Sequence, residues 1–206
     1  MGGVSHRGGE LFVGSRFIKN IKMDMNKLTE SEVSKAFFTI ILKNVDDAWP
    51  EVYGELRRLF GKEYDFQIKD EDNAKMSLAC AIIALELRPL EQLFPERVGR
   101  IYKKSLEGFQ EQEDRIYVHN KIQEYREKFL EFMERYSKNP HHVHAEPAAQ
   151  LLKDWFGNDI NKIYLKDFNE INPVIPGILN SMVIHLVGFW KNINSKFEVI
   201  DDNAHD

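Results

Sequence analysis

Three closely spaced histidines are the residues with the clearest capacity for chemistry. His141, His142 and His144 are followed by Glu146 within the proline-flanked segment 139–147. Neutral imidazole and carboxylate groups are ligands for zinc and other transition metals. The four residues are therefore a candidate metal site, either of a metal-binding protein or of a metal-dependent hydrolase. The competing interpretation is a solvated polar loop, because adjacent histidines seldom both face one ion and no cysteine lies nearby.

A second candidate site combines side chains from two helices that we expect to pack together. His119 flanks the apolar side of one predicted helix, which also carries Tyr125 and Phe129, and His185 lies in a later apolar segment. A buried histidine pair could act as acid and base or bind a metal or haem. With the two aromatic residues it would line an apolar pocket for a small ligand or cofactor. The alternative is unrelated core histidines that bond hydroxyl or carbonyl groups.

The common catalytic motifs are absent from the sequence. No glycine-rich phosphate loop follows a strand, and neither a Gly-x-Ser-x-Gly elbow nor a His-Glu-x-x-His motif occurs. The expectation leans against an enzyme. It favours a non-enzymatic regulatory or protein-interaction domain that binds a protein partner or associates with itself as a homodimer.

The longest regular pattern in the chain predicts a helix over residues 113–136. Its apolar residues alternate spacings of four and three, which places them on one stripe: Val118, Ile122, Tyr125, Phe129, Phe132 and Tyr136. We expect this helix to be central and to bury the stripe against the alanine-rich segment 78–87 of the same chain.

Capping residues and prolines divide the preceding sequence into shorter helices. Thr29 and Glu32 form a capping box that opens the first helix. Pro50 is placed at the start of a second helix, and Pro89 and Pro95 separate a third from a fourth. The spacing predicts packed antiparallel neighbours.

An uncharged stretch at 173–190 raises the question of a membrane span. It is slightly short for a bilayer and contains Pro176 and His185. We expect a buried core helix and no membrane span.

The chain is expected to form one all-α domain, a bundle of about six to eight helices over residues 25–197. A flexible basic, glycine-rich arm precedes it at 1–24, and a polar tail follows at 198–206.

The composition indicates which kinds of binding partner and which cellular compartment fit the protein. The 206 residues include 28 lysines and arginines and 33 aspartates and glutamates, so the net charge of −5 disfavours nucleic acid binding. The single cysteine, Cys80, lies in an apolar run, which indicates a packing role and a reducing, cytoplasmic location.

Overall fold

Helices dominate the computed structural model, which describes residues 27–60, 68, 70–138, 146–156, 164–165, 170–171, 183 and 185–203. The fold is all-α, as expected. The six helices among these residues are α2 (Glu30–Phe60), α3 (Glu71–Leu93), α4 (Val98–Leu106), α5 (Gln112–Lys138), α6 (Glu146–Phe156) and α8 (Phe189–Lys196). Two short strand pairs accompany them: β1 (Lys27–Thr29) runs parallel to β4 (Glu198–Ile200), and β2 (Tyr164–Leu165) is antiparallel to β3 (Glu170–Ile171).

Helix α2 begins with the predicted capping box. The Glu32 backbone N–H donates to Thr29 Oγ1 at 3.2 Å, and the Thr29 N–H donates to Glu32 Oε2 at 2.9 Å. The expected break before Pro50 is wrong, because α2 continues through this proline to Phe60. Its buried residues keep helical spacing on both sides of the proline: Phe37, Ile41, Val45, Trp49, Val52 and Leu56. Burial of this continuous stripe offsets the roughly 3 kcal/mol that an internal proline costs.

Helix α3 is the element that the rest of the chain covers. The Asp70 side chain caps it by accepting a hydrogen bond from the Asn73 N–H at 2.9 Å. It packs against α2, α4, α5, α6 and α8, and every residue from Ser77 to Ala84 is buried. Like α2, it passes through a proline, Pro89, because Leu87 and Leu90 on either side are buried. The central position therefore belongs to α3, with α5 packed upon it.

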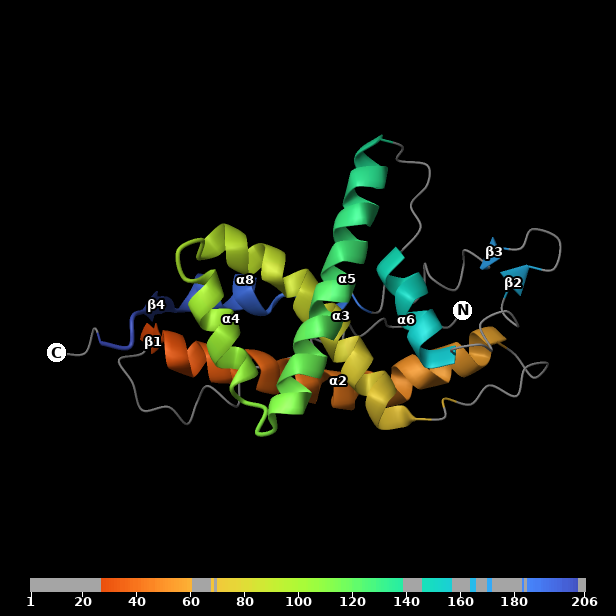
Figure 1. Ribbon diagram of the computed structural model, residues 1–206, viewed down its shortest axis with the longest axis horizontal. Coiled ribbons are helices and arrows are strands. Elements are labelled where there is room, and N and C mark those ends of the chain that lie inside the picture. The colour runs from red at the N-terminus through yellow and green to blue at the C-terminus, as the bar shows by residue number, and fades with distance from the viewer. Residues whose placement is uncertain are drawn as a thin grey trace, which may run out of the picture.

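Helix α5 spans the predicted central-helix segment and crosses α2 steeply. Val118, Ile122 and Tyr125 are buried, as the stripe predicted, and Phe129 is partly buried. Figure 1 shows the C-terminal end of this green helix rising beyond the other described helices. Only part of α5 therefore lies within the body of the protein.

The C-terminal part of the chain differs from the sequence-based expectation. Most of the predicted core helix at 173–190 lies outside the described residues, and α8 begins only at Phe189. Trp190 is fully buried, with its ring 4.8 Å from that of Phe37. Residues 198–200, assigned to a polar tail, instead form β4 beside β1. Bilayer crossing would need a longer and more apolar helix than any among the described residues.

Candidate functional site

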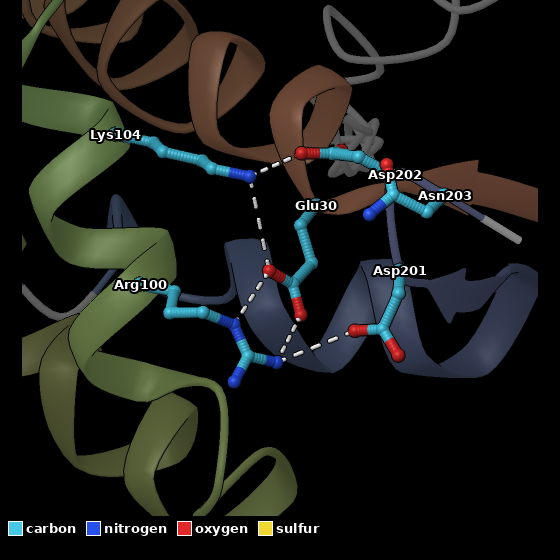
Figure 2. Close-up of a pocket in the computed structure, with 6 residues that line it drawn as sticks. All are labelled: Glu30, Arg100, Lys104, Asp201, Asp202 and Asn203. Atoms are coloured by element: carbon cyan, nitrogen blue, oxygen red, sulfur yellow. Dashed lines mark hydrogen bonds and ion pairs between the residues drawn. The ribbon is translucent and has the colours of Figure 1, made fainter.

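A charged pocket forms where the two ends of the described chain meet. It has a volume of about 560 Å³. Figure 2 shows its lining, which comes from the start of α2, from α4 and from the segment after β4: Glu30, Arg100, Lys104, Asp201, Asp202 and Asn203. Acidic and basic side chains alternate across it, so the pocket is a network of ion pairs.

The cations in and beside the pocket come from the N-cap and one side of α4. Arg97, Arg100 and Lys104 follow one another at spacings of three and four, which places them on the same helix face. That face is turned toward the N-terminus of α2, where the helix dipole favours negative charge. The segment after β4 adds Asp201 and Asp202 at the same place.

Glu30 is the buried centre of this network. Its side chain is 3% exposed, and Arg100 binds it with two hydrogen bonds, Nη2 to Oε1 at 2.6 Å and Nε to Oε2 at 3.0 Å. Arg97 Nε lies 3.6 Å and Lys104 Nζ 3.9 Å from its oxygens. The bonds from Arg100 lower the pKa of the Glu30 carboxyl, with burial acting in the opposite direction.

Asp202 joins the end of the described chain to the start of α2. Its carboxylate accepts hydrogen bonds from the Ser31 N–H and the Ser31 hydroxyl, both at 2.8 Å, and from the Lys104 ammonium. Lys104 first, and then Ser31, lower the pKa of Asp202 to about 2. Ser31 and Asp202 stand 171 positions apart in the sequence, so this contact holds the two ends of the described chain together.

Acid unfolding is expected to reveal this contact. A carboxyl whose folded-state pKa is depressed stabilises the fold above its unfolded-state pKa, and this contribution is lost as the pH falls through the folded-state value. The ordinary pKa of aspartate is 3.8, so the stabilisation by Asp202 should disappear between about pH 4 and about pH 2. Urea unfolding of the wild type and of Asp202→Asn should give a constant difference in free energy of unfolding above pH 5, and a shrinking one below pH 4.

The matched control is Asp47→Asn, which changes an exposed carboxylate of α2 outside the pocket. This variant should follow the wild type across the same pH range. If the difference in free energy of unfolding between the wild type and Asp202→Asn persisted unchanged to pH 2, the stabilisation would not come from the ionised Asp202 carboxylate.

A second polar cluster lies between α5 and α6. Lys121 Nζ lies 2.9 Å from Asp154 Oδ2, which also accepts a hydrogen bond from the Tyr125 hydroxyl. Gln150 Nε2 donates to Glu124 Oε1 at 2.8 Å and extends the cluster along α6. These bonds satisfy polar groups at the edge of the core and hold α6 against α5.

The groups of this second cluster are not activated for nucleophilic chemistry. Burial raises the pKa of the Cys80 thiol to about 12, so the thiol is protonated at neutral pH. Burial and the neighbouring Asp154 raise the pKa of the Tyr125 hydroxyl as well. The nearby Lys121 and Asp154 bind each other, which fits a structural role.

The predicted metal site falls on residues that the structure does not describe. His141, His142 and His144 lie outside the described residues. Glu146 is the first residue of α6, and the position of its side chain is also outside the description. The zinc or other transition metal site thus stays a prediction. Within the described part of the chain, no three histidine, cysteine or carboxylate side chains are grouped as metal ligands.

The structure does not bring the second predicted set together. His119 Nδ1 lies 3.0 Å from the Tyr102 hydroxyl of α4, whereas His185 is exposed. Tyr125 binds Asp154 in the core, and Phe129 is partly buried. These four residues do not line the described pocket, which is charged and lies at the other side of α4.

The exposed side of α5 is a separate surface feature. Ile116 is 52% exposed, Tyr117 44% and Leu130 54%. These are the large hydrophobic residues with high exposure among the described side chains, and all three lie on this one helix. Ile116 and Leu130 share one face of the helix, whereas Tyr117 lies about 100° around it and its hydroxyl donates a hydrogen bond to Asn73.

Sequence reasoning missed the charged pocket. The spacing of Arg97, Arg100 and Lys104 was visible in the sequence, but it does not identify the acidic partners. Asp201 and Asp202 were assigned to a polar tail, although they complete the pocket. No family model, curated protein or solved structure matches the chain, so the site rests on its own geometry.

Proposed function

We propose that the chain is a non-enzymatic protein-interaction domain that binds a partner protein through the exposed side of α5. The observation that carries this proposal is the concentration of exposed large hydrophobic side chains on this helix, Ile116, Tyr117 and Leu130. A cytoplasmic location belongs to the same proposal, since Cys80 is buried and forms no disulfide.

Ile116 and Leu130 share one side of α5. Fourteen residues correspond to about four helical turns, so the two side chains lie about 21 Å apart along the same face. The buried residues Val118, Ile122 and Tyr125 occupy the opposite face against α3 and α6. A partner helix could therefore lie along the exposed face without disturbing the core.

The charges beside these apolar residues favour a basic partner over a second copy of the chain. Glu113, Glu127 and Glu131 are exposed at helical spacings that place them near Ile116 and Leu130. Glu131 is paired with Lys128 across 3.1 Å, which leaves the face acidic overall. Two such faces would repel each other, whereas an amphipathic helix with lysine or arginine beside its apolar residues would complement the surface.

The test uses a synthetic amphipathic peptide of leucine and lysine, carrying a fluorescent label, and a matched peptide with glutamate in place of lysine. Fluorescence anisotropy should show that the wild type binds the lysine peptide and not the glutamate peptide. The double variant Ile116→Ser, Leu130→Ser should bind it at least tenfold more weakly, since tenfold corresponds to about 1.4 kcal/mol of lost apolar contact.

Asn120→Ser is the matched control, because Asn120 is an exposed polar residue on the same face. It should bind like the wild type, and both variants should keep the thermal unfolding midpoint. Equal binding of the lysine peptide by the wild type and the double variant would overturn the proposal.

A further inference from the structure

β4 lies in the structure as a short extended peptide added to β1. The pairing is parallel over three residues, Lys27 with Glu198, Leu28 with Val199 and Thr29 with Ile200. The middle pair, Leu28 and Val199, is buried, whereas Glu198 is exposed. Val199 is thus a buried side chain between the exposed Glu198 and the partly buried Ile200, and a pocket for an alternate side chain is how a sheet edge recognises an extended peptide.

The acidic residues after β4 are bound by groups of α2 and α4. Asp202 accepts hydrogen bonds from the backbone and hydroxyl of Ser31 and from Lys104, and Asp201 Oδ1 lies 3.3 Å from Arg100 Nη2. Figure 2 shows both aspartates turned toward the cations of α4. We name the surface formed by β1, the start of α2 and α4 the groove between β1 and α4; it holds one apolar side chain followed by two carboxylates.

Without this segment the groove would be strongly cationic. The three cations Arg97, Arg100 and Lys104 would then face Glu30 as the remaining carboxylate among the residues described at the pocket. The Ser31 N–H at the start of α2 and the open edge of β1 would also lose their partners. An acidic extended peptide would satisfy all of these groups at once.

The contacts that hold the segment are of a kind that can exchange. A pair of three-residue strands is weak by itself, and the Asp201–Arg100 ion pair, with side chains 60% and 54% exposed, contributes little and is screened by salt. Asp201, Asp202 and Asn203 are exposed, whereas the preceding α8 is fixed by the buried Trp190 and Ile193. Release can therefore be confined to residues 198–203.

We propose that the groove between β1 and α4 is a docking site for an extended acidic segment of a partner protein, and that residues 198–202 are its intramolecular, autoinhibitory ligand. The preferred partner carries a β-branched apolar residue followed, two positions later, by two acidic residues, as Val199, Asp201 and Asp202 do. This site is independent of α5 and has the opposite charge preference. A second copy is disfavoured because Phe197 alone links α8 to β4, which is too short to reach another molecule without collision.

The test uses the 206-residue chain. A substitution releases the intramolecular segment from the groove, and the same segment is then added as a free peptide. Val199→Asp places a charge at the buried position of β4 and leaves the groove unchanged. The probe is a labelled peptide with the sequence of residues 197–203, FEVIDDN, and the control peptide is FEVINNN.

In the wild type the attached segment competes with the probe at an effective concentration on the order of mM, so the probe should bind weakly. Val199→Asp should bind FEVIDDN at least tenfold more tightly than the wild type does and at least tenfold more tightly than it binds FEVINNN.

Adding Lys104→Met to Val199→Asp should weaken probe binding, because the partner of the second aspartate is removed. A folded Val199→Asp protein that binds the two peptides equally, or binds FEVIDDN no better than the wild type, would overturn the proposal. A wild-type dimer in sedimentation that FEVIDDN dissociates would reassign the groove to a second copy and overturn the partner assignment.

Amide hydrogen exchange of the unmodified chain keeps the proposal testable if Val199→Asp fails to fold. The backbone amides of β4 and of Ser31 should exchange at least a hundredfold faster than those of Leu78 to Ala84 in α3. Exchange of both groups at the same rate, as in global unfolding, would show that the segment is not separately released and would overturn the proposal.

Discussion

Replacing Glu86 with alanine is expected to lower the free energy of unfolding by about 2–4 kcal/mol, because buried polar groups would lose their hydrogen bonds. Glu86 is a buried residue of α3 whose carboxylate sits at the N-terminus of α8. Oε1 accepts hydrogen bonds from the backbone N–H groups of Gly188 and Phe189, the latter at 2.8 Å, and Oε2 accepts from Trp190 at 3.4 Å. The N-terminal amides of a helix have no partner within the helix, so alanine would leave them unsatisfied.

The conservative variant Glu86→Gln separates the hydrogen bonds from the charge. Glutamine retains one oxygen acceptor but loses the interaction of a carboxylate with the helix dipole, so it should cost about 1–2 kcal/mol. Chemical unfolding measures both changes, and hydrogen exchange should locate the early loss of protection in α8. A Glu86→Ala protein as stable as the wild type would show that water or another group replaces the carboxylate.

The glycine at the start of α8 belongs to the same arrangement. Gly188 has a φ of +143°, in a region that disfavours side chains, and its amide lies against the Glu86 carboxylate. This contact joins residues about a hundred positions apart, and nothing in the local sequence of either residue indicates it. Sequence patterns therefore predicted neither the extent of α8 nor its attachment to α3.

Local signals were reliable where a few neighbouring residues determine the structure. The Thr29–Glu32 capping box predicted for the first helix is present in the structure. The alanine-rich segment expected to pack against the long helix is buried from Leu78 to Ala84 and contacts α5. Such features depend on helical period and capping, which short stretches of sequence carry.

The prolines gave wrong helix boundaries. A proline destabilises a helix locally, but tertiary contacts of the same helix can offset that cost, and these contacts are not visible in the local sequence. Pro50 and Pro89 were expected to separate helices, but α2 and α3 pass through them. Trp49 beside Pro50 packs edge-to-face on Trp155 of α6, with ring centroids 5.7 Å apart. The sequence of α2 alone contains no information about that contact.

The charged pocket was unpredictable for a similar reason. Its cations lie in α4, while its carboxylates come from the start of α2 and from residues just after β4. Runs of charged residues are usually solvated, and only the parallel pairing of β1 with β4 brings Asp201 to the arginines and Asp202 to Lys104. The pairing depends on two three-residue strands, which are too short to stand out in the sequence.

Arg100→Ala is expected to lower the free energy of unfolding measurably, because it removes the main partner of a buried carboxylate. Glu30 would retain Arg97 and Lys104 at 3.6 and 3.9 Å, which are too long for good hydrogen bonds. Removing the carboxylate as well should recover part of the loss. The double variant Glu30→Gln, Arg100→Ala should therefore be more stable than Arg100→Ala alone, and a double-mutant cycle should show a coupling between the two positions.

The pH dependence distinguishes this explanation from a simple loss of packing by the arginine side chain. Arg100 is the largest cause of the lowered pKa of Glu30, so its removal should raise that pKa toward the ordinary value of 4.5. The stability contributed by ionised Glu30 is lost as the pH falls from its unfolded-state pKa to its folded-state pKa, so a folded-state pKa closer to 4.5 leaves less stability to lose. The free energy of unfolding of Arg100→Ala, measured with urea across pH 2–7, should therefore fall less on acidification than that of the wild type. An acid-dependent loss as large as that of the wild type would mean that Arg100 acts through packing, and that Arg97 and Lys104 are sufficient to hold the Glu30 charge.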